Sequence, residues 1–314
     1  MATAVVTEGL TKDFRAGFWR SRPHRALDGL SLEIPTGGVF GLLGPNGAGK
    51  STTLKILINL LWPSAGRAQV LGRPPGDVEA RRRLGFLPEH PTFYDHLTAE
   101  ELLTYFAGLF GYSPADRRTR ASRFLDLVGI GADRRRLLRH YSKGMVQRVG
   151  IAQALINDPE LVILDEPMSG LDPVGRRDIR DLILQLRDEG RTVLFSSHIL
   201  SDAELLCSRV AILARGRLVA SGALSDLTAA QPGSGAGDGW EVVAINVRPE
   251  VADRLTAGVR RATCIAPGRY SFELAPEVRP ETLVADLASA GASVVSLAPV
   301  RTTLEDVFME RITR

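Results

Sequence analysis

Residues Gly44-Pro45-Asn46-Gly47-Ala48-Gly49-Lys50-Ser51 decide the fold, because their glycines, lysine and serine stand in the phosphate-loop pattern G-x-x-x-x-G-K-[ST]. The apolar run Val39–Leu43 before them is typical of a buried parallel strand. After them, apolar residues recur at helical spacing, at Leu54, Leu57, Ile58 and Leu61. The segment is therefore predicted to connect a strand to a helix, and this context disfavours an ordinary glycine-rich turn.

This loop, with Thr52 at its end, has the chemistry of a triphosphate site. Its glycines allow backbone N–H groups to turn inward around phosphate oxygens. The N-terminus of the following helix adds roughly half a positive charge. We expect Lys50 to reach the β- and γ-phosphates and the Ser51 hydroxyl to ligate Mg²⁺.

Two further apolar runs end in side chains suited to phosphate chemistry. Leu161–Leu164 is followed by Asp165 and Glu166. An aspartate at a strand end beside a phosphate loop can hold Mg²⁺, and the next carboxylate can polarise an attacking water. The alternative, a solvated acidic turn, is disfavoured by the phosphate loop. His198 follows the candidate strand Arg191–Ser197; it is predicted either to contact the γ-phosphate or to be structural.

The stretch Tyr141-Ser142-Lys143-Gly144-Met145 is, taken alone, an ordinary Ser/Gly turn. Ser142 and the amides near Gly144 can also begin a helix through Leu155, which gives a second helix N-terminus able to bind an anion. Its position between the phosphate loop and Asp165 favours a role at the triphosphate.

Composition narrows the class of protein. The 314 residues are 44% hydrophobic and 24% charged, an ordinary globular mix, and the length favours two domains. The net charge of +3 is too small to indicate nucleic-acid binding, and we expect none. Cys207 and Cys264 lack metal or redox spacing, so we expect two free buried thiols in a reducing cytoplasm. The sequence shows no signal peptide and no apolar run near the ~20 residues that cross a bilayer. We expect another chain to span any membrane that the protein serves.

The chain divides into three parts. Residues 1–230 alternate apolar runs and amphipathic stretches, which indicates an α/β domain. Residues 231–239 form a Gly/Ser linker. Residues 240–314 are predicted to form a small α+β appendage, with strands at Trp240–Val247 and Cys264–Leu274, a helix at Pro280–Ala290, and a capping box at Thr302–Glu305 that opens a last helix through Phe308.

The motifs together resemble the ATP-binding subunit of an ABC transporter. GPNGAGKST, YSKGM-x-QR, LVILDEP, SGLDP (Ser169–Pro173) and His198 occur in that family's order, and the resemblance covers residues from about 5 to 225. The segments Leu84–Glu89 and Leu304–Phe308 are most similar to the bacterial branch that includes drug, antibiotic-resistance and sodium exporters.

The resemblance implies a phosphate-loop α/β core with a helical subdomain at about residues 92–139 and a signature helix to about residue 155. It implies that two such domains pack head to tail around two ATP molecules, as a homodimer or pseudo-dimer. Signature residues Ser142, Lys143, Gly144 and Met145 of one subunit then face the ATP held by Lys50 of the other, and Asp172 lies at their interface. Phe14 matches the aromatic residue that stacks on adenine; it could instead be a core residue at a strand end.

Two positions depart from the family pattern. The signature is usually Leu-Ser-Gly-Gly-Gln, and Lys143 adds a cation that points either toward the partner's phosphates or into solvent. Glu89 stands where the family usually has Gln, and it is a further candidate ligand for Mg²⁺. In addition, Arg15–Arg25 is an apparent insertion, which could bind anionic lipid or a membrane partner, or form a solvated hairpin.

The resulting hypothesis is an ATPase that uses ATP and Mg²⁺, sits on the cytoplasmic face of the membrane and powers an exporter through a separate membrane-spanning permease. A soluble ABC ATPase acting on ribosomes or DNA is the alternative, although such relatives usually carry two ATPase domains or long coiled coils. A binding module that uses ATP only to hold a dimer is a third hypothesis, and Glu166 and His198 argue against it.

Overall fold

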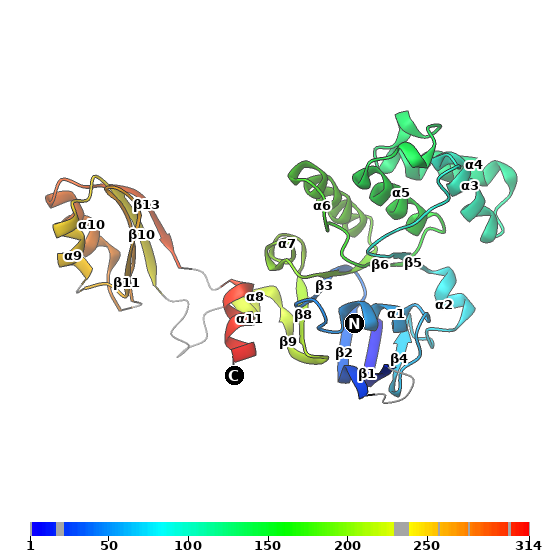
Figure 1. Cartoon of the computed structure of the whole chain (residues 1–314), viewed down its shortest axis with the longest axis horizontal. Coiled ribbons are helices and arrows are strands. Elements are labelled where there is room, and N and C mark those ends of the chain that lie inside the picture. The colour runs from blue at the N-terminus through cyan, green and yellow to red at the C-terminus, as the bar shows by residue number, and fades with distance from the viewer. Residues whose placement is uncertain are drawn as a thin grey trace. The chain divides into compact units, whose positions relative to one another are not determined.

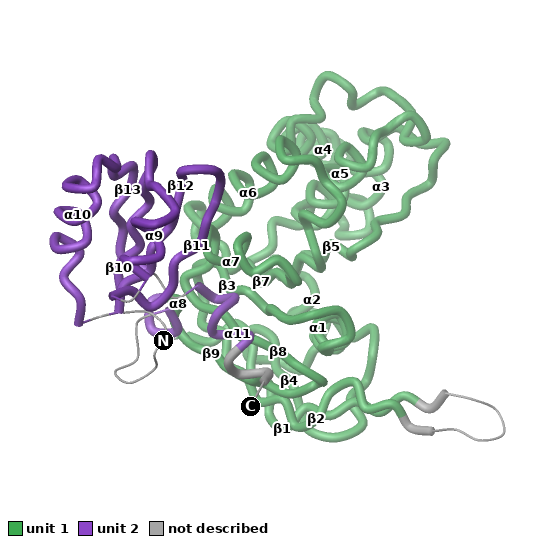
Figure 2. The backbone as a smooth tube through the Cα atoms, turned by 60° about the vertical axis from the view of Figure 1, so that its left-hand side comes forward, with its two compact units in different colours: residues 1–224, 314 green, residues 225–313 purple. Residues whose placement is uncertain are grey.

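The computed structural model describes residues 2–16, 22–228, 239–256, 258–275, 277–300 and 303–313. The chain forms two compact units, residues 1–224 with residue 314, and residues 225–313 (Figure 2). We call them unit 1 and unit 2. None of the helices in the described part of the chain is both long enough and apolar enough to cross a membrane.

Unit 1 is built on a six-stranded sheet with the strand order β5-β6-β7-β3-β8-β9. Its strands are β3 (Gly38–Leu43), β5 (Leu84–Leu87), β6 (Leu161–Leu164), β7 (Thr192–Ser197), β8 (Arg209–Ala214) and β9 (Arg217–Ala223). All pairs are parallel except β8 with β9. Because parallel strands are covered on both faces, β6 and β7 are buried along their whole length. The carboxyl ends of β3, β6 and β7 therefore meet at one edge of the sheet.

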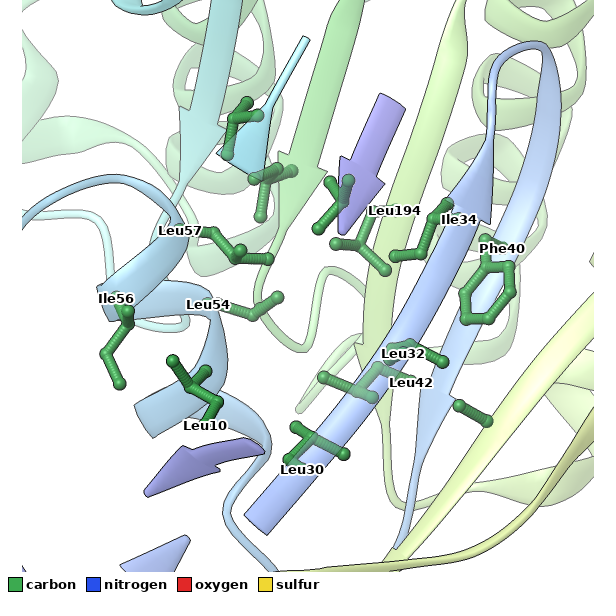
Figure 3. Close-up of a cluster of buried hydrophobic side chains, with 14 of the residues drawn as sticks. Leu10, Leu30, Leu32, Ile34, Phe40, Leu42, Leu54, Ile56, Leu57 and Leu194 are labelled. Atoms are coloured by element: carbon green, nitrogen blue, oxygen red, sulfur yellow. The ribbon is translucent and has the colours of Figure 1, made fainter. Parts of the chain in front are cut away.

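A second, antiparallel sheet has the order β2-β1-β4 and consists of β1 (Thr3–Ala16), β2 (Arg22–Pro35) and β4 (Ala65–Val70). Helix α1 (Lys50–Leu57) packs between the two sheets. Its Leu54 and Leu57 meet Leu10 and Leu30 from the small sheet and Leu42 from the large one (Figure 3). This shared core fixes the start of α1, and with it the phosphate loop, against β3.

The other helices of unit 1 are α2 (Val78–Arg82), α3 (Ala99–Leu109), α4 (Pro114–Leu127), α5 (Lys143–Leu155), α6 (Pro173–Asp188) and α7 (Leu200–Leu206), with short 3-10 turns at Gly131–Asp133 and Leu138–His140. Helices α6 and α7 pack on β3 and β7, and α5 packs on β5. Helices α3 and α4 pack on each other and on α5, and these three form a group beside the sheets (Figure 1). Thr98 and Glu101 form a capping box that starts α3.

Unit 2 has the element order β10 (Trp240–Ile245), α9 (Pro249–Thr256), β11 (Arg261–Ala266), β12 (Arg269–Glu273), α10 (Pro280–Ser289) and β13 (Ser293–Pro299), with α8 (Leu224–Thr228) before and α11 (Leu304–Thr313) after them. Its antiparallel sheet has the order β11-β12-β10-β13. Two β-α-β segments are thus interleaved in one sheet, the split β-α-β arrangement.

The structure confirms the predicted α/β class and corrects several details. The predicted strand Cys264–Leu274 is a hairpin of β11 and β12, because Gly268 has a φ of +72° and turns the chain. The last capping box pairs Thr303 with Asp306 instead of Thr302 with Glu305; Thr302 lies outside the described residues. Cys207 is buried as expected, but Cys264 is exposed on β11.

Two predicted segments fall largely outside the described residues. Of the Gly/Ser linker, only Gly239 is described. Of the insertion Arg15–Arg25, residues 17–21 are not described, and the remainder extends β1 and β2 as an antiparallel pair. On that pair Arg25 contacts Asp13 and Asp28 at 2.9 and 3.0 Å.

Candidate active site

The phosphate loop lies between β3 and α1, and its backbone requires glycine. Gly44 has a φ of +148°, and a Cβ atom there would lie 2.3 Å from the Leu213 carbonyl oxygen. Gly49 has a φ of +106°, and its Cβ would lie 2.7 Å from the Ala26 carbonyl oxygen. Any side chain at either position would therefore force the loop away from the strands beneath it.

The loop forms one wall of a cavity of about 380 Å³. The cavity is lined by Pro45, Asn46, Gly47, Ala48, Gly49, Lys50, Ser51 and Thr52 from the loop, together with Phe14, His24, Ala26, Glu89 and Glu166. Residues from β1, β2 and the end of β6 thus meet around the start of α1. Of the predicted loop residues, Gly44 alone is absent from this lining, and its carbonyl oxygen instead accepts a hydrogen bond from Lys50 at 2.7 Å.

Lys50 is almost fully buried, and its ammonium group has a carboxylate partner. Its side chain is 5% exposed, and Nζ lies 3.2 Å from Glu166 Oε1. A buried charge is costly unless it is paired and hydrogen-bonded. The carboxylate of Glu166 and the carbonyl oxygen of Gly44 satisfy the Lys50 ammonium, and the oxygens of a bound phosphate would compete for the same group.

Asp165 lies within hydrogen-bond distance of two hydroxyl groups. Ser51 Oγ donates to Asp165 Oδ1 at 3.1 Å, and Ser196 Oγ donates to the same oxygen at 2.7 Å. Carboxylate and hydroxyl oxygens are ligands that suit Mg²⁺. Ser51 and Asp165 come from α1 and β6, far apart in sequence, and they could hold such an ion together with phosphate oxygens.

Glu166 is held in an uncommon backbone conformation. Its φ is +48°, a left-handed value that costs of the order of 1–3 kcal/mol for a residue other than glycine. Its N–H donates to Ser196 Oγ at 2.9 Å, and its Oε2 lies 2.8 Å from His198 Nδ1. If the carboxyl group is ionised, His198 Nδ1 must carry the hydrogen. The carboxylate therefore has one oxygen on Lys50 and one on His198.

Phe14 and His24 are directly opposite each other in the β1–β2 pair. Both line the cavity, and Phe14 is only half-buried, so it is not a residue of the core between the sheets. Lys12 Nζ lies 5.2 Å from the centre of the Phe14 ring and donates to the Trp62 carbonyl oxygen at 2.6 Å. The Phe14 ring therefore lines the cavity from β1, where a base could stack on it.

The signature residues Ser142 to Met145 do not line this cavity in the same chain. Ser142 is the N-cap of α5, and its Oγ accepts from the Met145 N–H at 3.3 Å. Lys143 is exposed and lies over Gly170, where a Cβ atom would be 2.1 Å from Nζ. Gly144 and Met145 form the first turn of α5, so their amides lie at its positive end.

Asp172 caps a helix, and Glu89 lines the cavity. Asp172 caps α6 and accepts from the Gly175 N–H at 2.8 Å. Glu89 lines the cavity, with its carboxylate 3.9 Å from His90. Among the side chains that the structure describes, Glu89 has no hydrogen bond to Ser51 or Asp165. It belongs to the cavity but not to the Ser51–Asp165 pair.

Two residues of the site were missed from the sequence: Ser196, which bonds both Asp165 and Glu166, and His24, which faces Phe14. Gln147 of the YSKGM-x-QR motif donates from Nε2 to the Pro167 carbonyl oxygen at 2.9 Å, which ties α5 to the end of β6. The signal for Ser196 was its place at the end of an apolar strand, immediately before His198. Using it required knowing that β6 and β7 are neighbours.

Comparison with known proteins points to one family. A family model described as ABC transporter matches residues 27–169. An uncharacterised ABC transporter ATP-binding protein of Synechocystis is 44% identical over 99% of this chain and 85% of its own length. The daunorubicin/doxorubicin resistance ATP-binding protein DrrA of Streptomyces peucetius is 41% identical over 71% of this chain and 66% of its own. A solved ATP-binding cassette, dimeric and bound to ADP and Pi, is 28% identical, covers 70% of this chain and 98% of its own, and has a TM-score of 0.64.

Proposed function

The chain belongs to the ATP-binding proteins of ABC transporters, and we propose that it hydrolyses ATP to power an exporter whose membrane-spanning part is a separate subunit. It is an ATPase of this family. The observation that carries the proposal is the cluster at the carboxyl ends of β3, β6 and β7. There Lys50, Ser51, Asp165, Glu166 and His198 meet at one edge of the sheet.

Each residue of the cluster has a chemical role in the proposal. Lys50 and the loop amides bind the phosphates of ATP, while Ser51 and Asp165 hold Mg²⁺, which neutralises phosphate charge. Glu166 orients the attacking water and accepts its proton, and His198 fixes the carboxylate through Nδ1. Phe14 stacks on the adenine ring. Glu89 remains a candidate for the outer contacts of the metal.

We assign the signature residues to a second copy. Ser142 and the first turn of α5 lie outside the cavity of their own chain, yet they form a helix N-terminus suited to phosphate. In a head-to-tail pair, this N-terminus faces the γ-phosphate held by the other copy, and Asp172 lies near the interface. The dimeric relative supports this arrangement.

A second cavity, of about 430 Å³, is a candidate contact for the membrane subunit. Val78, Arg81 and Arg82 line it from α2, and Leu109 and Phe110 from the end of α3. Val78, Leu109 and Phe110 are 54%, 64% and 38% exposed, so three large apolar side chains lie together at this cavity. We propose that an acidic, amphipathic segment of the permease docks here and places the protein on the cytoplasmic face of the membrane.

Reconstitution with a candidate membrane-spanning permease tests the proposal. Lys50→Ala removes the cation that binds the phosphates, so ATP binding, hydrolysis and substrate export should all be lost. Lys55→Ala is the matched control, because Lys55 lies in the last turn of the same helix and is exposed. Unchanged nucleotide affinity in Lys50→Ala would refute the assignment of the site, and hydrolysis without any transport would refute the exporter.

A further inference from the structure

Unit 2 uses only one face of its sheet for its own core. Helices α9 and α10 lie on the same face of the sheet (Figure 1). Beneath them, Val242 and Ala244 of β10 and Phe272 of β12 are buried with Leu283 and Leu287 of α10. Successive side chains of a strand point to opposite faces, so the residues between these core positions form a second face.

The second face carries exposed apolar side chains. We call it the open face; it includes Glu241, Val243 and Ile245 of β10 and Arg269, Ser271 and Glu273 of β12. A hydrogen bond of 2.6 Å from Ser271 Oγ to Glu241 Oε1 places these two side chains together on it. On this face Ile245 is 36% exposed and Ser271, at its centre, is 8% exposed. Ile265 of β11 and Val295 of β13 are both 52% exposed and lie at register shifts of the edge strands.

The open face carries two carboxylates and one arginine at one end and the single arginine Arg269 at the other. Glu241 is directly opposite Glu273, with Arg261 next to Glu273 on the edge strand β11. Directly opposed like charges destabilise a sheet, and within the described residues neither carboxylate has an ion-pair partner. Arg269 is opposite Ile245 at the other end, about 13 Å away along the strands.

We infer that two copies of this chain pack their open faces against each other about a two-fold axis. The axis passes through the middle row, where Val243 is opposite Ser271. A two-fold rotation then places Arg269 of each copy over Glu241 and Glu273 of the other. The surface is self-complementary in charge, which is the requirement for an isologous contact. The same rotation covers Ile245 of each copy with the Glu241 end of the other copy's β10.

The area of the open face limits the strength of this contact. Four strands about 4.8 Å apart and about five residues long make a face of roughly 300 Å². That is far below the roughly 800 Å² per partner of a stable interface, so the contact is weak alone. The contact is populated when a second contact between the same two copies raises the effective concentration of one open face near the other to the millimolar range. That second contact is the head-to-tail ATPase dimer, so this step rests on the proposed function.

Cysteine cross-linking in the full-length protein tests the inference. Val243→Cys, in a Cys264→Ser background, places a thiol beside the two-fold axis. Without nucleotide and at about millimolar protein, which matches a tethered effective concentration, a short bismaleimide should link two copies. Glu250→Cys is the matched control, because Glu250 is exposed on α9 and lies on the covered face. Equal cross-linking of the two variants would overturn the inference.

Charge reversal gives a second, independent arm. Adding Arg269→Glu to Val243→Cys places three carboxylates together, so the cross-linked fraction should fall by roughly tenfold or more. Adding Glu241→Arg and Glu273→Arg to that variant should restore it. A cross-linked fraction that is the same in all of these charge variants would also overturn the inference. Steady-state hydrolysis of wild-type protein reports on the proposed function separately, because it does not depend on the cross-link.

Discussion

At the residue scale, Ser196 links the two carboxylates of the site. Its hydroxyl donates to Asp165 and accepts from the Glu166 N–H, so it fixes the position of both. Removing this buried hydroxyl would leave Asp165 with its hydrogen bond from Ser51 alone and the Glu166 N–H without its acceptor. The geometry of the two carboxylates to which we assign catalysis and metal binding is therefore set in part by a residue that need not touch ATP.

Ser196→Ala should accordingly reduce ATP hydrolysis by about 10–100-fold, the usual loss when a residue that orients a ligand is removed. ATP affinity measured without Mg²⁺ should hardly change, whereas the Mg²⁺ concentration for half-maximal hydrolysis should rise. Ser197→Ala is the control, since within the described residues the Ser197 hydroxyl bonds only to the backbone of Ile199. An equal loss in both variants would show that strand packing, and not the carboxylate contact, matters.

At the scale of elements, an ion pair ties the start of β5 to the start of β6. Arg83 donates to both carboxylate oxygens of Glu160, each at 2.6 Å. The hydrogen bonds from Arg83 lower the pKa of Glu160 below its ordinary value. Because the folded pKa is depressed, the stabilisation is present above the unfolded pKa and is lost as the pH falls through the folded pKa.

Arg83→Met should therefore lower the free energy of unfolding by up to about 1 kcal/mol at neutral pH, the value of a largely exposed pair. The difference from wild type should vanish at a pH below both pKa values of Glu160. Denaturant unfolding at the two pH values measures it. Arg82→Met serves as the control, because the guanidinium group of Arg82 makes a much longer contact, 3.8 Å, with the carboxylate of Glu79. A loss that persists in acid would mean that Arg83 acts through packing.

The elements were predictable where the sequence pattern is local. The phosphate loop between β3 and α1, and the strand ending at Asp165, follow from short apolar runs and a spacing rule. The start of α5 at Ser142 follows from its N-cap. The order of the strands in the sheet cannot be read from a local pattern. That order places β7 beside β6 and so makes Ser196 a neighbour of Asp165. The β11–β12 hairpin was missed although its turn has a local signal, since the dipeptide Pro267-Gly268 between the two strands is typical of a turn.

At the scale of the whole molecule, each copy has half of the proposed machinery in its cavity. The residues that bind phosphate meet within one chain, whereas Ser142 lies apart on the first turn of α5. Resemblance to the family predicts this division, and substitutions at Ser142 test it.

Ser142→Asp and Ser142→Asn separate the two roles of this residue. Both side chains are as good as serine at an N-cap, so α5 should keep its start in each. The aspartate alone adds a negative charge facing the γ-phosphate of the other copy, so hydrolysis should fall at least tenfold more than in the asparagine variant. ATP binding to dilute, monomeric protein should be equal. Equal hydrolysis by the two variants would contradict the shared site.

The most direct test of the central claim is the steady-state rate of ATP hydrolysis by Glu166→Gln compared with wild type. Glutamine keeps the shape of the side chain but cannot accept the proton of the attacking water. The rate should fall by about 10²–10⁴-fold while ATP still binds. Hydrolysis by Glu166→Gln at the wild-type rate would contradict the claim that the carboxylate held between Lys50 and His198 is the catalytic one.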